Sequence, residues 1–417
     1  MVKNKIKSIK AREILDSRGN PTLEVEVQTP SGVFLASVPS GASKGKHEAL
    51  ELRDNEERYG GKGVLRAVEN INKKIAPLLI GRESTKQEEI DQLMINLDGT
   101  KKKEKLGANA ICGVSLAACR AGAAGSNLSP WSYINKIFNF KFALYDLPKP
   151  CFNLINGGAH AGNDLDFQEF MVVPQENYFS ENLRVAAETY HSLKEIIFKK
   201  YGKGATNLGD EGGFAPPLKA PEEAIELVMA AAQKLNYKIK IIIDVAASQF
   251  FKAGKYKTYK GVFKGDVLAD YYFDLIKKYP ILGLEDPFAE DDWESWTIFK
   301  SKIKSKKSKI LIIGDDLLVT NPERIKLAEK KEAVNAMILK INQIGTVWEA
   351  LEAARLAKEF GFKTVVSHRS GETNDDFISD FALGIGADFI KSGAPARGER
   401  LAKYNRLLKI EKEFKPR

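Results

Sequence analysis

The sequence of 417 residues predicts an α/β protein in which a C-terminal (β/α)8-type barrel follows a smaller α+β domain. Three features support this fold class. An alternating strand pattern opens the chain, a mainly helical stretch follows it, and short β-branched runs alternate with helical patterns after residue 150. Repeated strand-then-helix units of this length are typical of a barrel. We therefore assign residues 1–140 to the first domain and residues 141–417 to the second.

The first domain is expected to contain a three-stranded meander and helices. Residues 22–27 (TLEVEV) alternate polar and apolar side chains, which is the period of a half-buried strand. Pro30-Ser31-Gly32 is a turn signal, and the run 33–38 (VFLASV) starts the next strand. A loop rich in glycine and small residues follows at 39–49, and a helical pattern extends from about residue 63 to 125.

The second domain is expected to hold strands buried on both faces, because its apolar runs are nearly continuous. Two intervening helices carry start signals: Thr346 with Glu349 is a capping-box pattern, and Asn321-Pro322-Glu323 combines a cap, a proline and an acid. An open doubly wound sheet is the alternative, but it usually carries a glycine fingerprint after its first strand, and we find none. The runs are 239–246, 281–287, 310–316, 336–342, 364–368 and 388–394.

Composition excludes several classes of protein. With 43% hydrophobic and 9% aromatic residues, the chain is neither disordered nor short of core material. It has no run of about 18 apolar residues for a membrane span and no secretory signal, and its three cysteines form no CxxC pair. A reducing, cytoplasmic location is the simplest interpretation. The net charge of +9 includes lysine clusters at 101–105 and 300–309, which we interpret as solvated faces, with a polyanion-binding patch as the alternative.

A polar residue stands near the C-terminal end of each of the six apolar runs. Successive members lie about one strand-helix unit apart, so all six are expected to project into the same mouth of the barrel. Active sites of barrels lie at this C-terminal mouth. The six residues are Asp244, Glu285, Asp315, Lys340, His368 and Lys391.

Three consecutive members of this set are carboxylates, Asp244, Glu285 and Asp315, and they predict a metal site. Three converging carboxylates cannot all stay ionised without a cation. An all-oxygen ligand set favours Mg²⁺, with Mn²⁺ as the usual substitute. Asp286 and Asp316 follow two of these ligands directly. Simple strand alternation turns them to the other side, so we interpret both as structural.

Lys340 and Lys391 end the strands beside the predicted metal site. Two cationic neighbours are expected to depress a lysine's pKa and to make a basic amine accessible. The alternative is that both lysines only neutralise the carboxylates.

Two loops that contain glycine add further polar groups. The loop 156–164 carries His160 and is followed by Gln168 and Glu169, and the loop 207–216 carries Glu211. Glycine lets the backbone of such loops approach a ligand closely. We interpret His191 and His47 as structural.

Together these segments resemble the enolase family over essentially the whole chain. SHRSGET (367–373) and LKINQIG (339–345) are the most specific matches. SGAS-KG, NGGAHAGN, LGDEGGFAP, LEDPF, GDDLLVTNP and KSGAPARGERL occur in the same order. The resemblance implies a Mg²⁺-dependent, reversible dehydration of 2-phosphoglycerate to phosphoenolpyruvate.

The resemblance also implies a role for each candidate. Asp244, Glu285 and Asp315 would hold the first Mg²⁺, and Ser43 would help to hold a second ion that arrives with substrate. Lys340 would remove the proton at C2, and Glu211 would protonate the departing C3 hydroxyl with support from Glu169 and His160. Residues expected to bind the substrate are His368, Arg369, Ser370, Lys391, Gln168 and Ser43, with Arg369 and Ser370 as a phosphate clamp.

Members of this family usually form homodimers or larger homo-oligomers. The loops around Ser43 and His160 are expected to act as lids over the substrate. Gln249 and Lys44 depart from the family pattern without touching a mapped position. One rival interpretation is a racemase or cycloisomerase of the same superfamily, which would usually carry paired bases and lack the SHRS clamp. The other is a non-catalytic surface protein that binds nucleic acid or a host protein, a role that is also conceivable as a secondary one.

Overall fold

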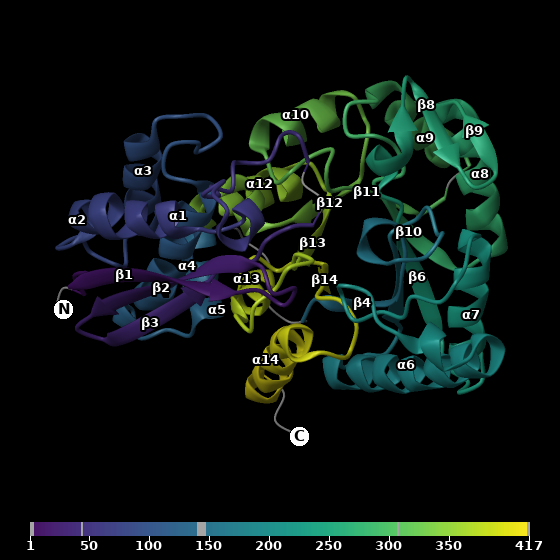
Figure 1. Ribbon diagram of the computed structural model, residues 1–417, viewed down its shortest axis with the longest axis horizontal. Helices are drawn as coiled ribbons and strands as arrows, with labels where there is room; N and C mark the ends of the chain where they lie inside the picture. Colours follow the sequence, from purple (N-terminus) through teal and green to yellow (C-terminus); the bar gives the residue numbers. More distant parts are fainter. Residues whose placement is uncertain (1–3, 43–44, 140–146, 307, 415–417) are drawn as a thin grey trace.

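The computed structural model describes residues 4–42, 45–139, 147–306 and 308–414, and it consists of a small sheet with helices beside a closed barrel (Figure 1). The predicted fold class is confirmed. The domain boundary expected at residues 140 and 141 falls outside the described residues and stays a prediction.

The N-terminal sheet is an antiparallel meander of β1 (Ser8–Leu15), β2 (Pro21–Thr29) and β3 (Gly32–Ser37), as predicted. The alternation in β2 buries Leu23, Val25 and Val27 completely. Helix α4 (Ala108–Gly125) packs against this sheet, and Gly113 permits the close approach, because a Cβ there would come within 2.7 Å of Val25. The other helices are α1 (Leu65–Asn70), α2 (Ala76–Leu79), α3 (Gln87–Asp98) and α5 (Pro130–Phe138).

The barrel closes through eight strands, in the order β10-β11-β12-β13-β14-β4-β5-β6. Seven of its strands run in the same direction, but β5 is antiparallel to both of its neighbours, β4 and β6. The first unit of the barrel is therefore a hairpin instead of a strand-helix-strand unit. The strands are β4 (Lys149–Asn156), β5 (Glu169–Pro174), β6 (Ile239–Asp244), β10 (Ile281–Glu285), β11 (Leu311–Gly314), β12 (Ala336–Leu339), β13 (Lys363–Ser367) and β14 (Phe389–Lys391).

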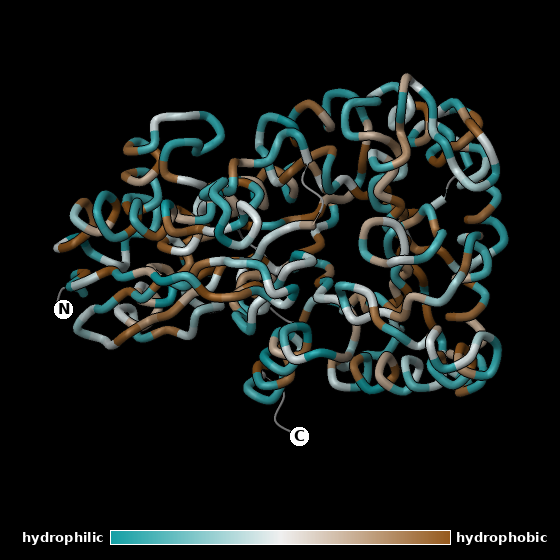
Figure 2. Tube along the Cα trace, in the orientation of Figure 1, coloured by the Kyte–Doolittle hydropathy of each residue, from teal (hydrophilic) through white to brown (hydrophobic). Residues whose placement is uncertain are grey.

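Side chains fill the barrel interior, so the barrel is a packed core. Met171, Ile242, Ile338 and Val365 belong to one buried cluster, and a larger cluster joins the strands to the surrounding helices. Figure 2 shows hydrophobic residues along the barrel strands and hydrophilic residues along the outer loops. The helices of this part are α6 (Phe179–Tyr201), α7 (Pro221–Gln233), α8 (Gly265–Lys278), α9 (Trp293–Ser305), α10 (Pro322–Lys330), α11 (Ile341–Ile344), α12 (Val347–Glu359), α13 (Phe377–Gly384) and α14 (Gly398–Phe414), with a small sheet β7 (Phe251–Lys252), β8 (Lys255–Thr258), β9 (Gly261–Phe263).

Both predicted helix starts are confirmed. The Thr346 hydroxyl accepts a hydrogen bond from the Glu349 backbone N–H at 3.1 Å, at the start of α12. The Asn321 side chain accepts one from the Glu323 N–H at 2.8 Å, at the start of α10. Each cap satisfies a backbone donor that the first helical turn leaves unpaired.

The lysine clusters differ from each other. In α9, Lys300 donates to the Val334 carbonyl at 2.6 Å, while Lys302 and Lys304 form surface ion pairs. The expectation of a solvated face is wrong for Lys103, which is only 3% exposed and pairs with Glu349 at 2.9 Å. A charged group buried to that extent needs such a partner. Among the helices that the structure describes, none combines the length and the apolar character needed to traverse a bilayer.

Candidate active site

Strand register brings the acids of three neighbouring strands to the same mouth of the barrel. Glu169 begins β5 and lies opposite Asn156 at the end of β4 and Asp244 at the end of β6. Asp244 in turn pairs with Glu285, the last residue of β10. Because β5 runs in reverse, its first residue shares the mouth with the last residues of its parallel neighbours.

A cavity of about 430 Å³ opens at this mouth. Five of the six strand-end residues line it, and Glu285 does not; instead, Glu285 accepts two hydrogen bonds from the Lys391 ammonium, at 2.7 and 2.8 Å. The loop candidates also reach this cavity. Its lining includes His160, Gln168, Glu169, Glu211, Asp244, Asp315, Lys340, His368, Arg369, Ser370 and Lys391.

The three predicted metal ligands lie at this mouth, but each carboxylate is turned to a protein partner. Asp244 accepts from the Ala246 N–H at 2.9 Å, and Asp315 accepts from Gln343 at 2.9 Å and pairs with Lys340. Within the described ranges, the groups of His, Cys, Asp and Glu that gather tightly enough to hold an ion are His160-Glu169-Glu211 and Asp286-Asp315-Asp316.

The donor chemistry of the predicted trio nevertheless suits a hard cation, since all of its ligand atoms are carboxylate oxygens. Burial raises the pKa of Asp244 well above its ordinary range, and the nearby Glu285 charge raises it further. A cation beside these two carboxylates would relieve this repulsion.

The prediction that Asp286 and Asp316 turn away from the site is wrong, because both line the cavity. Asp286 has a left-handed φ of 42°, so strand alternation ends before it. Its carboxylate accepts hydrogen bonds from the backbone N–H groups of Asp315, at 2.9 Å, and Asp316, at 2.7 Å. Asp286 therefore shapes the turn that presents Asp315, which agrees with the structural role expected for it.

Without a metal ion, the carboxylates around the two lysines raise the pKa of both. Burial would lower the pKa of Lys340, but the Asp315 charge outweighs burial and raises it. The pKa of Lys391 is raised well above its usual range because the charges of Glu169 and Glu285 likewise outweigh burial. The depression expected beside a bound dication stays a prediction, because these shifts arise from the carboxylates alone. We call Asp244, Glu285, Asp315, Lys340 and Lys391 the base-side cluster.

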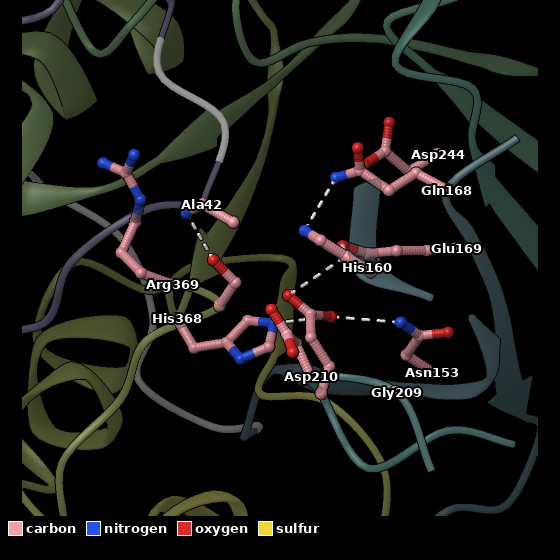
Figure 3. A network of polar contacts seen from close by, with 12 residues as sticks. Ala42, Asn153, His160, Gln168, Glu169, Gly209, Asp210, Asp244, His368 and Arg369 are labelled. Carbon is pink, nitrogen blue, oxygen red and sulfur yellow. Dashed lines mark hydrogen bonds and ion pairs between the residues drawn. The ribbon is translucent and has the colours of Figure 1, made fainter. Parts of the chain in front are cut away.

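A second group of buried side chains surrounds Glu211, and Figure 3 labels His160, Gln168, Glu169 and His368 among them. Asn153 donates to Glu211 at 3.0 Å, and the His368 Nε2 atom lies 3.3 Å from the same carboxylate. The His160 Nδ1 atom lies 3.6 Å from both Glu169 and Glu211. Gln168 contacts the other ring nitrogen of His160 at 2.9 Å. We call His160, Gln168, Glu169, Glu211 and His368 the acid-side cluster.

The two glutamates of the acid-side cluster have opposite pKa shifts. Burial, together with the Glu211 charge, raises the pKa of Glu169 well above its ordinary range. Burial acts on Glu211 in the same direction, but His368 and His160 outweigh it and hold the pKa of Glu211 well below its usual range. Of the two, Glu169 is therefore the group with the higher proton affinity, although the Lys391 ammonium lies 3.4 Å from it.

Arg369 and Ser370 lie beside the acid-side cluster. The Arg369 guanidinium donates to both carboxylate oxygens of Glu48, at 3.0 and 3.1 Å, and to Asn342 at 3.2 Å. The Ser370 hydroxyl accepts from the Ala42 N–H at 2.6 Å, so the glycine loop touches the expected clamp (Figure 3). Ser43 and its neighbour Lys44 lie outside the described residues.

The two remaining histidines lie away from the cavity lining. His191 is exposed on α6, and His47 pairs with Asp291 at 2.9 Å. Sequence reasoning did not find Glu48, Asn153 or Gln343, which bind three of the candidates. Gln343 belongs to the segment LKINQIG and is buried in a short helix that ends at a glycine. A polar amide in this segment could have been predicted to bind a neighbouring site residue.

Comparison with known proteins matches both parts of the chain to the enolase family. Residues 6–134 match the family described as the enolase N-terminal domain, and residues 144–416 match the enolase C-terminal TIM barrel domain. An enolase of Mastigamoeba balamuthi is 54% identical over 98% of this chain and 96% of its own length. Enolase B of Dictyostelium discoideum is 55% identical over 98% of this chain and 95% of its own length.

Proposed function

The chain belongs to the enolase family, and we propose that the base-side and acid-side clusters divide between them the two proton transfers of that family's reaction. The protein is a phosphopyruvate hydratase, a carbon–oxygen lyase of glycolysis that interconverts 2-phosphoglycerate and phosphoenolpyruvate. The observation that carries the division of roles is that one cavity is lined by Lys340 with its acidic partner Asp315, and by two glutamates that lie 3.6 Å from the same nitrogen of His160.

On the base side, we assign the C2 proton to Lys340 in its neutral form, which a cation held by Asp315 would favour by taking over the carboxylate that pairs with the ammonium. That proton lies next to an ionised carboxylate, so its removal leaves two negative charges on one carboxylate group. Lys391 would balance part of this charge, because its ammonium is buried and positive. In the reverse direction Lys340 would return the proton to C2.

On the acid side, we assign protonation of the departing C3 hydroxyl to Glu211, acting together with Glu169. A general acid must hold a proton, and in the resting arrangement Glu169 is the carboxyl group that favours one. His160 lies within 3.6 Å of both and supports transfer between them. The pair would then titrate as a unit, with neither pKa belonging to one residue alone.

We assign the phosphate to Arg369 and Ser370, and Gln168, His368, Lys391 and Ser43 complete the proposed substrate contacts. A guanidinium can bind a phosphate through two parallel N–H groups. Glu48 already fills this fork with a carboxylate, which supports Arg369 as an anion site.

Enolases use a divalent metal, and the all-oxygen donor set supports Mg²⁺ as that metal in this chain. We propose Asp244, Glu285 and Asp315 as ligands of one ion, and Ser43 as a ligand of a second ion that arrives with substrate. Bound there, the metal would stabilise the doubly charged carboxylate as a Lewis acid.

A homodimer or larger homo-oligomer and a cytoplasmic location are proposals that rest on the family resemblance alone. Substrate binding is implied by the relatives. For binding of nucleic acid or host proteins, the ion pairs in the lysine-rich helix α9 offer no support.

The test is Mg²⁺-dependent formation of phosphoenolpyruvate from 2-phosphoglycerate by the purified protein. We expect product formation that EDTA abolishes and that excess Mg²⁺ restores. A racemase, a cycloisomerase or a non-catalytic binding protein would form no phosphoenolpyruvate. Activity that persists in EDTA would contradict the metal assignment.

A further inference from the structure

Arg400, in the first turn of α14, is a completely buried arginine to which the roles above give no part. One terminal nitrogen donates to the His368 Nδ1 atom at 2.6 Å and to the Arg369 carbonyl at 2.7 Å. The other donates to the carbonyls of Asp210, at 3.0 Å, and Ser370, at 2.5 Å. A buried charge needs several such partners, but only one of these four is a group that can titrate.

The contact with His368 fixes the position of the ring proton. A guanidinium offers only N–H donors and has no lone pair, so Nδ1 must accept. A neutral imidazole has one N–H group, which therefore lies on Nε2. That nitrogen is the one that lies 3.3 Å from Glu211.

The other tautomer would be doubly unfavourable at this position. A proton on Nδ1 would point at the guanidinium, and the Nε2 lone pair would face the Glu211 carboxylate. The arrangement observed instead forms one continuous chain of donors, from Arg400 through His368 to Glu211.

We propose that Arg400 is a positioning residue that holds His368 neutral, with its proton on Nε2, so that His368 donates a hydrogen bond to Glu211. The inference rests on the acid role proposed for Glu211. Arg400 acts through His368 and is not itself one of the residues that line the cavity.

The charges around His368 support this assignment. Burial lowers the pKa of His368 to about 4, Glu211 and Glu372 act to raise it, and Arg400 acts to lower it. Without the guanidinium, the two carboxylates would face the ring unopposed, and the pKa of His368 would rise. An imidazolium would stabilise the Glu211 carboxylate more strongly than a neutral ring does, so the ability of Glu211 to deliver a proton would fall as the pH decreases.

Arg397 offers a matched control in the same segment. Its guanidinium donates to the carbonyls of Gly209 and Asp210, at 3.2 Å each, and to that of Ser17 at 3.2 Å. It therefore supports the backbone of the Glu211 loop, as Arg400 does, and it also pairs with Glu399 at 2.9 Å, but none of these partners is His368. Because the Arg397 side chain is 29% exposed and Arg400 is fully buried, the two variants are compared by the state of the His368 ring and not by their stability.

The direct test is ¹⁵N NMR of protein labelled in histidine, with the His368 signals assigned by their loss in His368→Gln. In the unsubstituted protein we expect a neutral ring protonated on Nε2 from pH 5.5 to 8. Arg400→Gln should mix the tautomers or protonate the ring within this range, and Arg397→Gln should not. A ring protonated on Nδ1 in the unsubstituted protein, or an unchanged ring in Arg400→Gln, would overturn the proposal.

Kinetics give a second readout. We expect Arg400→Gln to keep exchange of the C2 proton within a few fold, while dehydration falls at least tenfold and falls further as the pH decreases. Arg400→Lys, which keeps the charge and a donor, should recover part of the loss and serves if the glutamine variant does not fold. Equal loss of exchange and dehydration at every pH would show a merely structural arginine.

The two readouts also separate this proposal from the proposed function. The NMR result concerns the ring proton and needs no turnover. If it is as expected while Glu211→Gln still dehydrates substrate, the acid assignment fails and the control of His368 by Arg400 stands.

Discussion

The base-side and acid-side clusters are buried to a similar degree, yet they keep their charges in different ways. Glu285 and Glu211 are 1% and 2% exposed. On the base side, Lys391 and Lys340 neutralise Glu285 and Asp315 as ion pairs, and the pKa of Asp315 falls to about 2, because the Lys340 and Lys391 charges outweigh burial. On the acid side, burial raises the pKa of Glu169 well above its ordinary range although the Lys391 ammonium lies 3.4 Å away, and Glu211 is held by Asn153 and His368 instead of an ammonium.

This difference shows how one cavity can hold a site for a metal and a site for a proton. Burial favours the neutral form of every carboxyl group, and the neighbour decides whether a charge survives. An ammonium preserves a carboxylate that a metal ion can then bind. A second carboxylate, by contrast, forces one member of the pair to keep a proton that catalysis can use.

The largest expected difference between the clusters is in stability. Glu285→Gln removes one partner of a buried ion pair, so we expect it to lower the free energy of unfolding by roughly 3–5 kcal/mol. Glu169→Gln replaces a carboxyl group whose pKa burial raises and whose contact with Lys391 is longer, at 3.4 Å, so it should cost about 1 kcal/mol or less. Guanidinium unfolding midpoints at pH 7 in EDTA would compare them, and similar losses would show that both glutamates carry the same charge.

The pH dependence of stability should distinguish the acid-side cluster. The pKa of His368 is lowered from its ordinary value to about 4, so between pH 6.5 and 4 the unfolded chain binds more protons than the folded chain. Stability from this residue is present above pH 6.5 and is lost as the pH falls, by a total on the order of 3 kcal/mol.

The measurement is the unfolding midpoint at pH 4.5 and pH 7 for the unsubstituted protein and for His368→Gln. Glutamine can still donate toward Glu211 but does not titrate, so the variant should lose less stability on acidification. An identical loss in both proteins would show that His368 does not contribute to the pH dependence.

An effect smaller than the two above is expected at the proposed phosphate clamp, Arg369 and Ser370, which lies beside the acid-side cluster. Arg369→Lys keeps the positive charge but loses the two-pronged geometry, and one charged hydrogen bond contributes about 1.5–3 kcal/mol. We expect the KM for 2-phosphoglycerate to rise by roughly tenfold or more, with a smaller change in kcat. Steady-state kinetics would measure this, and an unchanged KM would remove Arg369 from the phosphate site.

Much of this arrangement could be predicted from the sequence, because the chemically active side chains stand at the ends of the apolar runs that form the strands. The apolar runs marked the strands, and the polar residue ending each run marked the mouth, so Asp244 and Lys340 were found without a structure. The direction of β5 was missed. It had a signal, since the segment between Asn156 and Glu169 is a loop that contains glycines and has no helical pattern, whereas the crossover between parallel neighbours usually contains a helix.

The remaining features depend on contacts that a local pattern does not contain. The left-handed φ of Asp286 ended the alternation that the prediction relied on. The pKa shifts of the lysines depend on the distance to carboxylates on other strands. Glu48 lies in a loop and contacts Arg369, which is far from it in the sequence, and Arg400 lies in a helix and contacts His368. Neither residue falls in a periodic sequence pattern that would have predicted these contacts.

The most direct test of the division between the clusters is exchange of the C2 proton of 2-phosphoglycerate with solvent, followed by NMR in deuterated buffer with Mg²⁺. Lys340→Ala should abolish exchange and dehydration together. Glu211→Gln should retain exchange within about tenfold of the unsubstituted protein while it forms no phosphoenolpyruvate. Near-normal exchange in Lys340→Ala, or loss of exchange in Glu211→Gln, would contradict the assignment of the two proton transfers to separate clusters.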